Sequence, residues 1–225
     1  MSAVFEHRSS ESPYVEIIWR GRVEKDYSPL CPADVRWNLL FVKNREKVRI
    51  SAEGPTTRSR LKNQFEGNQF LVIKFKLGVY MPYLPAIDLV DGDAVLPKAA
   101  GKSFSVNGSA WQLPSYENVE TFVDRLVRSG VLIVDPLVSA VLQDQPQELS
   151  DRSVRRRFLY ATGLTPRAIR QIERAQHAAA LLEKGASILD ATYEAGYADQ
   201  PHLTRSLKRF YGQTPAQLSR VAELA

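Results

Sequence analysis

The sequence predicts an α+β fold, in which an antiparallel β-sandwich or small β-barrel is followed by an all-α region. Three observations support this prediction. Short strand-like runs separated by turn signals fill the first hundred residues, and the spacing of apolar residues changes near Ser115. The last 80 residues then contain a repeat with an offset of 49 positions. The length of 225 residues allows one or two domains that each bury a core.

The first half is expected to consist of short antiparallel strands. Within 71–77 the odd positions are apolar, while Lys74 and Lys76 take the other face, which is the period of a strand with one solvated side. Runs rich in Val, Ile, Trp and Phe indicate three further strands, at 14–19, 36–42 and 47–51. The turn signals between them are Ser28-Pro29, Gly54-Pro55, Gly67-Asn68, Asp91-Gly92 and Asn107-Gly108.

The second half is expected to be helical. Apolar residues at spacings of three and four predict an amphipathic helix over 116–128, with Gly130 as its stop. Further helices are expected at 136–143, 151–162, 166–184, 188–195, 200–211 and 215–220. The sequence therefore predicts three regions, which are a β-rich domain at 1–115, a connecting helix within 116–135 and a helical domain at 136–225.

A shift of 49 positions superimposes two copies of one helical pattern. Each copy begins with an N-cap residue, has apolar residues four apart, and ends in a glycine followed by Thr-Pro, which starts the next helix. The matched pairs are Ser150/Asp199, Val154/Leu203, Arg156/Arg205, Phe158/Leu207, Gly163/Gly212, Thr165/Thr214 and Pro166/Pro215. The duplication predicts two similar helices with similar surroundings.

The second copy follows a short helix and a glycine turn, which is the pattern of a helix-turn-helix. Ser187 and Asp190 form a capping box for the first helix, Gly196 lies in the turn and Asp199 caps the second helix. One face of that second helix is apolar and must pack inward, through Leu203, Leu207 and Phe210. Its polar residues are Gln200, His202, Arg205 and Arg209, with Thr204 and Lys208 at the flank. Such side chains bind base edges and phosphates in the DNA major groove.

The first copy has a stronger positive charge. Arg152, Arg155 and Arg156 are spaced i, i+3 and i+4 and form one strip, with Arg157 beside it. These arginines would repel one another unless an anion lay opposite. A solvated charged face is the alternative for an isolated arginine-rich helix, but it does not explain the coincidence with the repeat.

The helix expected at 166–184 would separate the two copies. Its 19 residues span about 28 Å, close to the roughly 34 Å of one turn of B-DNA. A stiff helix of this length could hold two recognition helices in successive major grooves. A plain helical bundle would explain the spacer but not the duplicated arginines.

The stretch from Ala195 to Pro215 resembles the signature of the AraC-type transcription regulators almost position by position, and the resemblance extends over about 150–220. It implies a tandem helix-turn-helix DNA-binding domain at 136–225. The base contacts that it implies are Arg152, Arg155, Arg156, Gln200, His202 and Arg205, which agrees with the faces chosen above. The phosphate contacts we expect are Arg157, Thr204, Lys208 and Arg209.

The chain departs from the family pattern at two places. The first copy lacks a clear glycine turn, because 143–149 stands between its two helices. Thr192 occupies a position where the family usually has a small alanine packed against the recognition helix. The first departure leaves the crossing angle of the first module open, and the second could loosen the second module slightly.

Regulators of this family often carry an N-terminal cupin-like β-barrel, so the resemblance implies a sensor or dimerisation domain at 1–115. An effector pocket would be lined by Trp37, Phe75, Tyr80 and Tyr83, although aromatic residues in a β domain commonly form the core instead. The expected partners are double-stranded DNA, a small-molecule effector, a second copy of the chain and, for an activator, RNA polymerase. Activation or repression, the operator and the oligomeric state are left open.

Composition excludes several other classes. The net charge of +5 favours an anionic partner, the single cysteine fits a reducing compartment, and no signal peptide or membrane span is visible, so we expect a cytoplasmic protein. His7 is the only histidine of the first half, too few for a non-heme iron site, and we expect no catalytic residue, metal or cofactor. The alternative function is a small-molecule-binding or catalytic β-barrel with a helical docking module. RNA binding fits the charge but not tandem recognition helices.

Overall fold

The computed structural model describes residues 2–45, 47–98 and 102–223, and the side chains up to 220. The chain divides into two compact units. The first, the sheet unit, contains residues 1–28, 36–55 and 63–165. The second, the helical unit, contains 29–35, 56–62 and 166–225. The boundaries predicted at 115 and 135 remain predictions.

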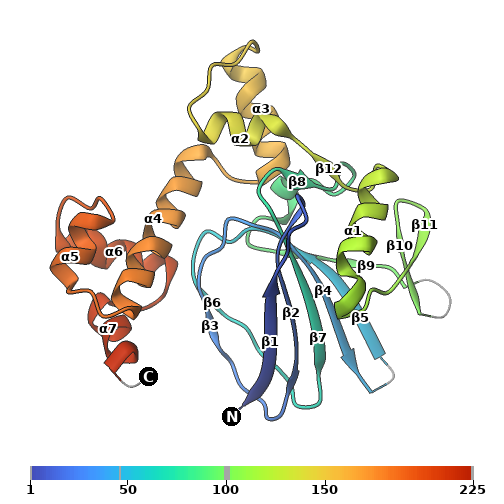
Figure 1. The fold of residues 1–225 in the computed structure, drawn as a ribbon, viewed down its shortest axis with the longest axis horizontal. Coiled ribbons are helices and arrows are strands. Elements are labelled where there is room, and N and C mark those ends of the chain that lie inside the picture. Colours follow the sequence, from blue (N-terminus) through green and yellow to red (C-terminus); the bar gives the residue numbers. More distant parts are fainter. Residues whose placement is uncertain (1, 46, 99–101, 224–225) are drawn as a thin grey trace. The chain divides into compact units, whose positions relative to one another are not determined.

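The sheet unit is built on a six-stranded antiparallel sheet (Figure 1). Its strands, in spatial order, are β1 (Ala3–Ser9), β2 (Val15–Val23), β7 (Gln69–Phe75), β4 (Asn38–Asn44), β5 (Lys47–Glu53) and β9 (Asp93–Leu96). The four strands predicted from sequence correspond to β2, β4, β5 and β7, so the antiparallel β-rich half is confirmed. The sheet remains open in the described residues, since β1 and β9 are its two edges. Closure into a barrel, the finer expectation, is not observed there.

Further short strands and the helix α1 pack beside this sheet. The pairs are β8 (Val79–Tyr80) with β12 (Ile133–Val134) and β10 (Ser103–Val106) with β11 (Ser109–Gln112). Two 3-10 helices, η1 (Ala86–Leu89) and η2 (Tyr116–Asn118), lie in the connections. The predicted amphipathic helix is α1 (Val119–Arg128), and it buries Val119, Phe122, Val123 and Leu126. These residues belong to the same hydrophobic core as the inner face of the sheet.

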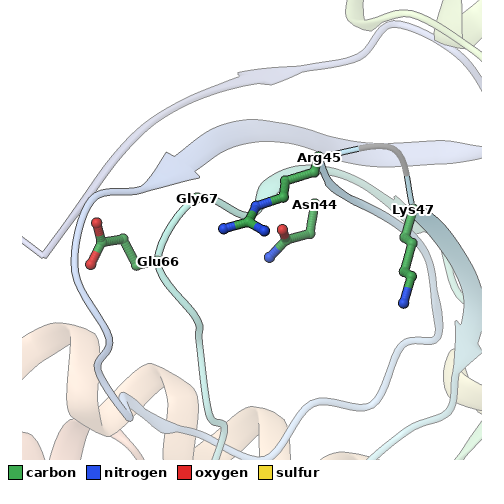
Figure 2. A pocket seen from close by; sticks show the side chains of 5 residues that line it. All are labelled: Asn44, Arg45, Lys47, Glu66 and Gly67. Atoms are coloured by element: carbon green, nitrogen blue, oxygen red, sulfur yellow. The ribbon is translucent and has the colours of Figure 1, made fainter.

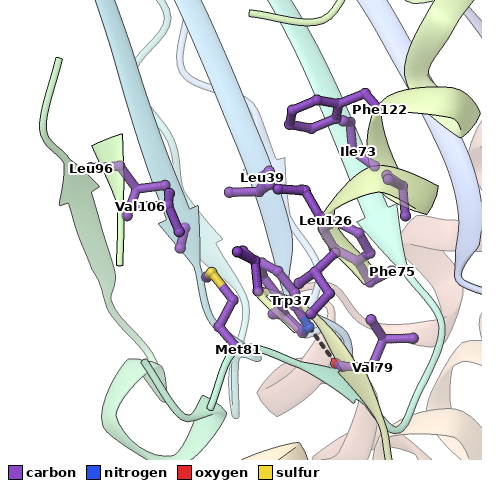
Figure 3. Close-up of a cluster of buried hydrophobic side chains, with 14 of the residues drawn as sticks. Trp37, Leu39, Ile73, Phe75, Val79, Met81, Leu96, Val106, Phe122 and Leu126 are labelled. Carbon is purple, nitrogen blue, oxygen red and sulfur yellow. Dashed lines mark hydrogen bonds between the residues drawn. The ribbon is translucent and has the colours of Figure 1, made fainter. Parts of the chain in front are cut away.

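The centre of this core is aromatic. Trp37 stacks on Phe75 with 4.2 Å between ring centroids, and its indole Nε1 donates a hydrogen bond to the carbonyl oxygen of Val79 at 2.6 Å (Figure 3). Phe41, Phe104 and Phe122 form a second group of tilted and edge-on rings. The indole N–H is therefore satisfied although the ring is buried, as a core tryptophan requires.

An ion pair between Arg8 and Glu120 links β1 to α1. The Arg8 guanidinium donates hydrogen bonds to both carboxylate oxygens of Glu120 and to the carbonyl oxygen of Tyr116. Ser10 donates a third hydrogen bond to the Glu120 carboxylate. The hydrogen bonds from Arg8 lower the pKa of Glu120 to about 2.

This lowered pKa predicts acid sensitivity. Because Glu120 has a lower pKa in the folded than in the unfolded chain, its contribution to stability is present above the unfolded value of 4.5 and is lost as the pH falls toward 2. Urea unfolding measured from pH 6 to pH 2.5 should therefore show a smaller pH-dependent loss for Glu120→Gln than for the wild-type chain. Equal losses in both proteins would contradict the assignment.

The remaining helices are α2 (Pro136–Leu142) and α3 (Asp151–Thr162) in the sheet unit. The helical unit contains α4 (Pro166–Glu183), α5 (Ile188–Glu194), α6 (Gln200–Phe210) and α7 (Pro215–Glu223). The last three of these helices pack against α4. All six helices expected after residue 136 are present, within one or a few residues of their predicted ends. The helical unit also contains the short strand pair β3 (Leu30–Cys31) and β6 (Arg60–Leu61).

Candidate nucleic-acid interface

The two repeated helices begin in the same way. The Ser150 hydroxyl accepts a hydrogen bond from the backbone N–H of Ser153 at 3.3 Å, at the start of α3. The Asp199 carboxylate accepts one from the N–H of His202 at 2.6 Å, at the start of α6. Both predicted N-caps are confirmed, and each satisfies an otherwise unpaired donor of the first turn.

The two helices also end in the same way. Gly163 and Gly212 have φ angles of 72° and 70°, in the left-handed region that glycine adopts without strain. Pro166 and Pro215 then open α4 and α7. At the second of these starts, the Thr214 hydroxyl accepts from the N–H of Gln217, whose side chain accepts from the N–H of Thr214. The repeat in sequence is therefore a repeat in structure.

The outer face of α3 carries the predicted cationic strip. Phe158, Ala161 and Thr162 are buried. Arg152, Arg155 and Arg156 are exposed and line a shallow groove of about 490 Å³. Within the described part of the chain, no hydrogen bond or ion pair occupies these three guanidinium groups. The strip can accept an anionic partner without first breaking internal contacts.

Arg157 has a different environment. Its Nε donates a hydrogen bond to the carboxylate of Asp135 at 2.5 Å, and the Asp135 side chain is only 2% exposed. The other oxygen of that carboxylate accepts from the N–H of Leu137 and caps α2. Asp135 thus joins the start of α2 to the middle of α3. This link connects the two helices of the first module, which has no glycine turn between them. The phosphate contact expected of Arg157 remains a prediction.

The back of α3 packs inside the sheet unit. The Tyr160 hydroxyl donates to the carbonyl oxygen of Pro82, and its ring lies edge-on to Tyr80 at 5.6 Å. A side chain at Gly163 would have its Cβ 2.6 Å from the carbonyl oxygen of Ala86 in η1. These contacts place α3 in the same compact unit as the β-sheet.

The face of α6 follows the predicted pattern. Leu203, Leu207 and Phe210 are buried. The side chains of the other face are exposed at Gln200, Arg205, Lys208 and Arg209, and half-buried at His202 and Thr204. Arg209 also lies over the ring of Phe210, 5.1 Å from its centroid. The inward and outward sets assigned from sequence are therefore reproduced on α6.

The turn before α6 is held by a side-chain network that the sequence did not indicate. The Tyr197 hydroxyl donates to the hydroxyl of Ser206 at 2.9 Å, and its ring meets His202 edge-on at 5.1 Å. On the other side, the Arg174 guanidinium of α4 lies 4.7 Å from the centroid of Tyr197 and donates to the carbonyl oxygen of Gly196. Residues of α4 and of the turn thus contact α6 near its start, where His202 lies against the Tyr197 ring.

The Thr192 hydroxyl does not disturb the module. The side chain is buried, and its hydroxyl donates to the carbonyl oxygen of Ile188, one turn earlier in α5, at 2.6 Å. The polar group is therefore satisfied inside its own helix. Nothing around Thr192 indicates the loosening considered at this position.

The linker helix α4 is continuous. It has 18 residues, which correspond to about 27 Å. It buries one face through Ile169, Ile172, Ala175, Ala178, Ala179 and Leu182. Its length agrees with the expected spacer, and the placement of α3 and α6 in successive grooves remains a prediction.

The four aromatic residues expected around an effector have different environments. Trp37 and Phe75 are core residues, 5% and 0% exposed. Tyr80 contacts α3 through Tyr160, and burial raises the pKa of both Tyr80 and Tyr83. An effector pocket lined by these residues remains a prediction.

A pocket of about 720 Å³ lies elsewhere in the sheet unit, beside the β4–β5 turn (Figure 2). Its lining residues are Asn44, Arg45, Lys47, Glu66 and Gly67. Arg45 has a φ angle of 49°, which is uncommon for a residue with a side chain. Two polar turns, far apart in sequence, form this pocket, and no periodic pattern could have indicated it.

Among the residues that the structure describes, no group of three or more His, Cys, Asp or Glu side chains is arranged to hold a metal ion. None of the described helices is both long and apolar enough to cross a membrane.

A family model described as a helix-turn-helix domain matches residues 148–220. No curated protein matches the chain. Among solved structures, the chain is similar to ToxT from Vibrio cholerae. The P21 crystal form gives a TM-score of 0.40 at 11% identity, covering 98% of this chain and 99% of that one. ToxT from strain O395 gives 0.42 at 11% identity, covering 98% of each chain. The family match confirms the helix-turn-helix domain expected from the sequence.

Proposed function

We propose that this chain, whose residues 148–220 form a helix-turn-helix domain of the AraC type, regulates transcription by binding DNA at a specific sequence. The observation that carries this proposal is the structural duplication of α3 and α6. Both helices have a side-chain N-cap, a buried apolar face and a left-handed glycine at the end. Both present arginine on the opposite face, where duplex DNA supplies the missing anion.

We propose that some of the exposed side chains on these helices bind base edges and that others bind phosphates. Arginine can bind guanine O6 and N7 with two hydrogen bonds, and glutamine can bind adenine in the same way. The base-reading residues would be Arg152, Arg155, Arg156, Gln200, His202 and Arg205. Thr204, Lys208 and Arg209 would hold phosphates beside α6, which fixes its register without reading sequence.

The length of α4 supports simultaneous reading of two grooves. Its span of about 27 Å approaches the roughly 34 Å that separate equivalent positions of the major groove. We propose that one chain places α3 and α6 in successive major grooves on the same side of the duplex.

Selection of bound fragments from a random pool of double-stranded DNA tests this function directly. We expect the full chain to enrich one asymmetric motif with two specified segments about one helical turn, or about 10 base pairs, apart. Recovery of no common motif, with binding that depends only on salt, would contradict sequence-specific regulation.

Lys208→Ala is expected to act on all DNA sequences alike. Loss of one phosphate contact should weaken binding to the selected motif and to random DNA by a similar factor, and should reduce the slope of log K against log[salt] by about 0.9. Titrations at four salt concentrations measure this slope, with Lys184→Ala, an exposed lysine just beyond α4, as the control. A changed base preference in Lys208→Ala would show that Lys208 reads sequence instead.

We further propose that a small effector bound to the sheet unit controls the protein. The pocket beside the β4–β5 turn is the part of the sheet unit that we would test first, because its volume of about 720 Å³ is sufficient for a small molecule. Pairing with a second copy, and contact with RNA polymerase if the protein is an activator, are further proposals of the same kind. A compound that raises the melting temperature of the wild-type chain but not of Arg45→Ala would support an effector site there, and equal shifts would argue against it.

A further inference from the structure

Two segments from the first half of the chain belong to the helical unit. They are residues 29–35 and 56–62, which we call the ribbon. Within the ribbon, β3 pairs with β6, and the backbone N–H of Lys62 donates to the carbonyl oxygen of Pro29 at 3.1 Å. Asp34 and Thr56 exchange two further hydrogen bonds, at 2.7 and 2.9 Å. The ribbon is thus an ordered element with its own internal bonds.

The ribbon caps the C-terminal end of α6. The last four carbonyl groups of a helix lack partners within it. Here, those of Leu207 and Lys208 accept from the N–H groups of Tyr211 and Gly212. The remaining two bond to the ribbon. The N–H of Ser59 donates to the carbonyl oxygen of Arg209 at 3.0 Å, and the N–H of Ala33 donates to that of Phe210 at 2.7 Å.

The contact is close-packed as well as hydrogen-bonded. A Cβ on Gly212 would lie 2.7 Å from a methyl carbon of Leu30 and 2.8 Å from the Ser59 hydroxyl oxygen. Ala33 is 1% exposed, and its carbonyl oxygen accepts from the Gln176 side chain of α4 at 3.1 Å. The neighbouring Tyr211 is half-buried, and this partial burial raises its pKa to about 12, with the Glu183 and Asp34 carboxylates adding to the effect. The ribbon therefore lies between α4 and the end of α6.

We propose that the ribbon is a working part of the second DNA-binding module, and that through it the first half of the chain controls how firmly α6 is held for DNA reading. This inference rests on the proposed function. Along the chain, the four ends of the ribbon continue toward β2, β4, β5 and β7. The last turn of α6 carries Lys208 and Arg209, so its order affects both groove contacts and register.

Ser59→Pro tests the cap, because proline has no N–H to donate to Arg209. Ser59→Ala is the matched control, since it keeps that N–H and loses only the hydroxyl. Gln176→Leu is a second variant that leaves the ribbon backbone intact and removes the bond to the carbonyl oxygen of Ala33. All three are made in the full chain.

The first measurement is amide hydrogen exchange without DNA. We expect Ser59→Pro and Gln176→Leu to speed exchange in the last turn of α6 by about three- to tenfold, the factor that corresponds to one net hydrogen bond. In both variants the amides of α3 should exchange as in the wild type. In the Ser59→Ala control the amides of α6 should also exchange as in the wild type. Should Ser59→Pro unfold the chain, Gln176→Leu alone decides this point.

The second measurement is binding to the selected DNA motif. We expect both variants to lose discrimination in the segment read by α6 and to keep it in the segment read by α3. The inference is overturned if amide exchange in α6 and base discrimination in both variants remain as in Ser59→Ala. It is also overturned if amide exchange in α6 becomes faster while base discrimination does not change. If the wild-type chain selects no motif, the proposed function fails, and regulation by the ribbon falls with it. The exchange result then still decides separately whether the ribbon holds α6.

Discussion

Arg156→Ala and Arg205→Ala are each expected to weaken binding to the selected DNA motif by about 1–3 kcal/mol and to relax the preference at one base pair. The two residues occupy the same position of the repeat, on α3 and α6, and both are exposed. Because each is proposed to bond a base edge with two hydrogen bonds, its loss should affect one base pair and leave the others unchanged.

The two substitutions should affect different segments of the motif. Binding of each variant to a panel of single-base-pair changes, at one fixed salt concentration, shows which base pair loses its effect. Arg128→Ala, an exposed arginine at the end of α1, is the matched control and should keep the full preference. If both test variants retain every base preference, the assigned recognition faces are wrong.

Arg157→Ala is expected to destabilise the fold rather than to change DNA reading. The substitution leaves the buried Asp135 carboxylate without its guanidinium partner, and breaking such a pair costs about 2–4 kcal/mol, toward the lower end because Arg157 is half exposed. The same carboxylate caps α2, so the loss should be concentrated in the first module. Urea unfolding of the wild-type and variant chains measures the difference.

A double-mutant cycle separates the ion pair from other effects. In Arg157→Ala/Asp135→Asn no buried charge is left unpaired, so part of the stability should return relative to Arg157→Ala alone. If Arg157 instead holds a phosphate, Arg157→Ala would leave the free energy of unfolding unchanged and would reduce the salt slope of DNA binding by about 0.9.

The parts of the fold that sequence predicts are those governed by local rules. The caps at Ser150 and Asp199, the left-handed glycines at 163 and 212, and the Thr-Pro starts each depend on a few neighbouring residues. The buried faces of α3 and α6 follow from periodicity, and the repeat strengthens each assignment because it occurs twice. Strands β2, β4, β5 and β7 were found for the same reason.

The parts that sequence could not give depend on contacts between distant residues. Ser28-Pro29 and Gly54-Pro55 indicate turns. No local pattern in the sequence shows that the segments after them donate hydrogen bonds to the carbonyl groups at 209 and 210, at the end of α6. The openness of the sheet depends on whether β1 and β9 pair, which neither strand encodes alone. Likewise, period-two alternation places Phe75 on the inner face without distinguishing a pocket from a filled core.

For charged residues, too, the sequence predicts the helix face on which a side chain lies but not its distant partner. The sequence placed Arg157 beside the cationic strip of α3, which is correct, but its partner Asp135 lies 22 positions earlier in the chain. The network of Arg174, Tyr197 and Ser206 is similar, because an arginine on α4 gives no local sign that it stacks on a turn residue. A regular spacing identifies the face of a helix, while the partner of an individual side chain depends on the tertiary fold.

Binding to a selected motif with five base pairs inserted between its two segments tests the central claim most directly. The insertion rotates one segment to the opposite side of the duplex, since one turn has about 10 base pairs. Because one continuous helix joins the two modules, we predict that affinity falls to the level of random DNA, and that a single substitution in either segment then has no further effect. Unchanged affinity for the lengthened motif would contradict the account, since it would mean that α3 and α6 do not read the same side of the DNA together.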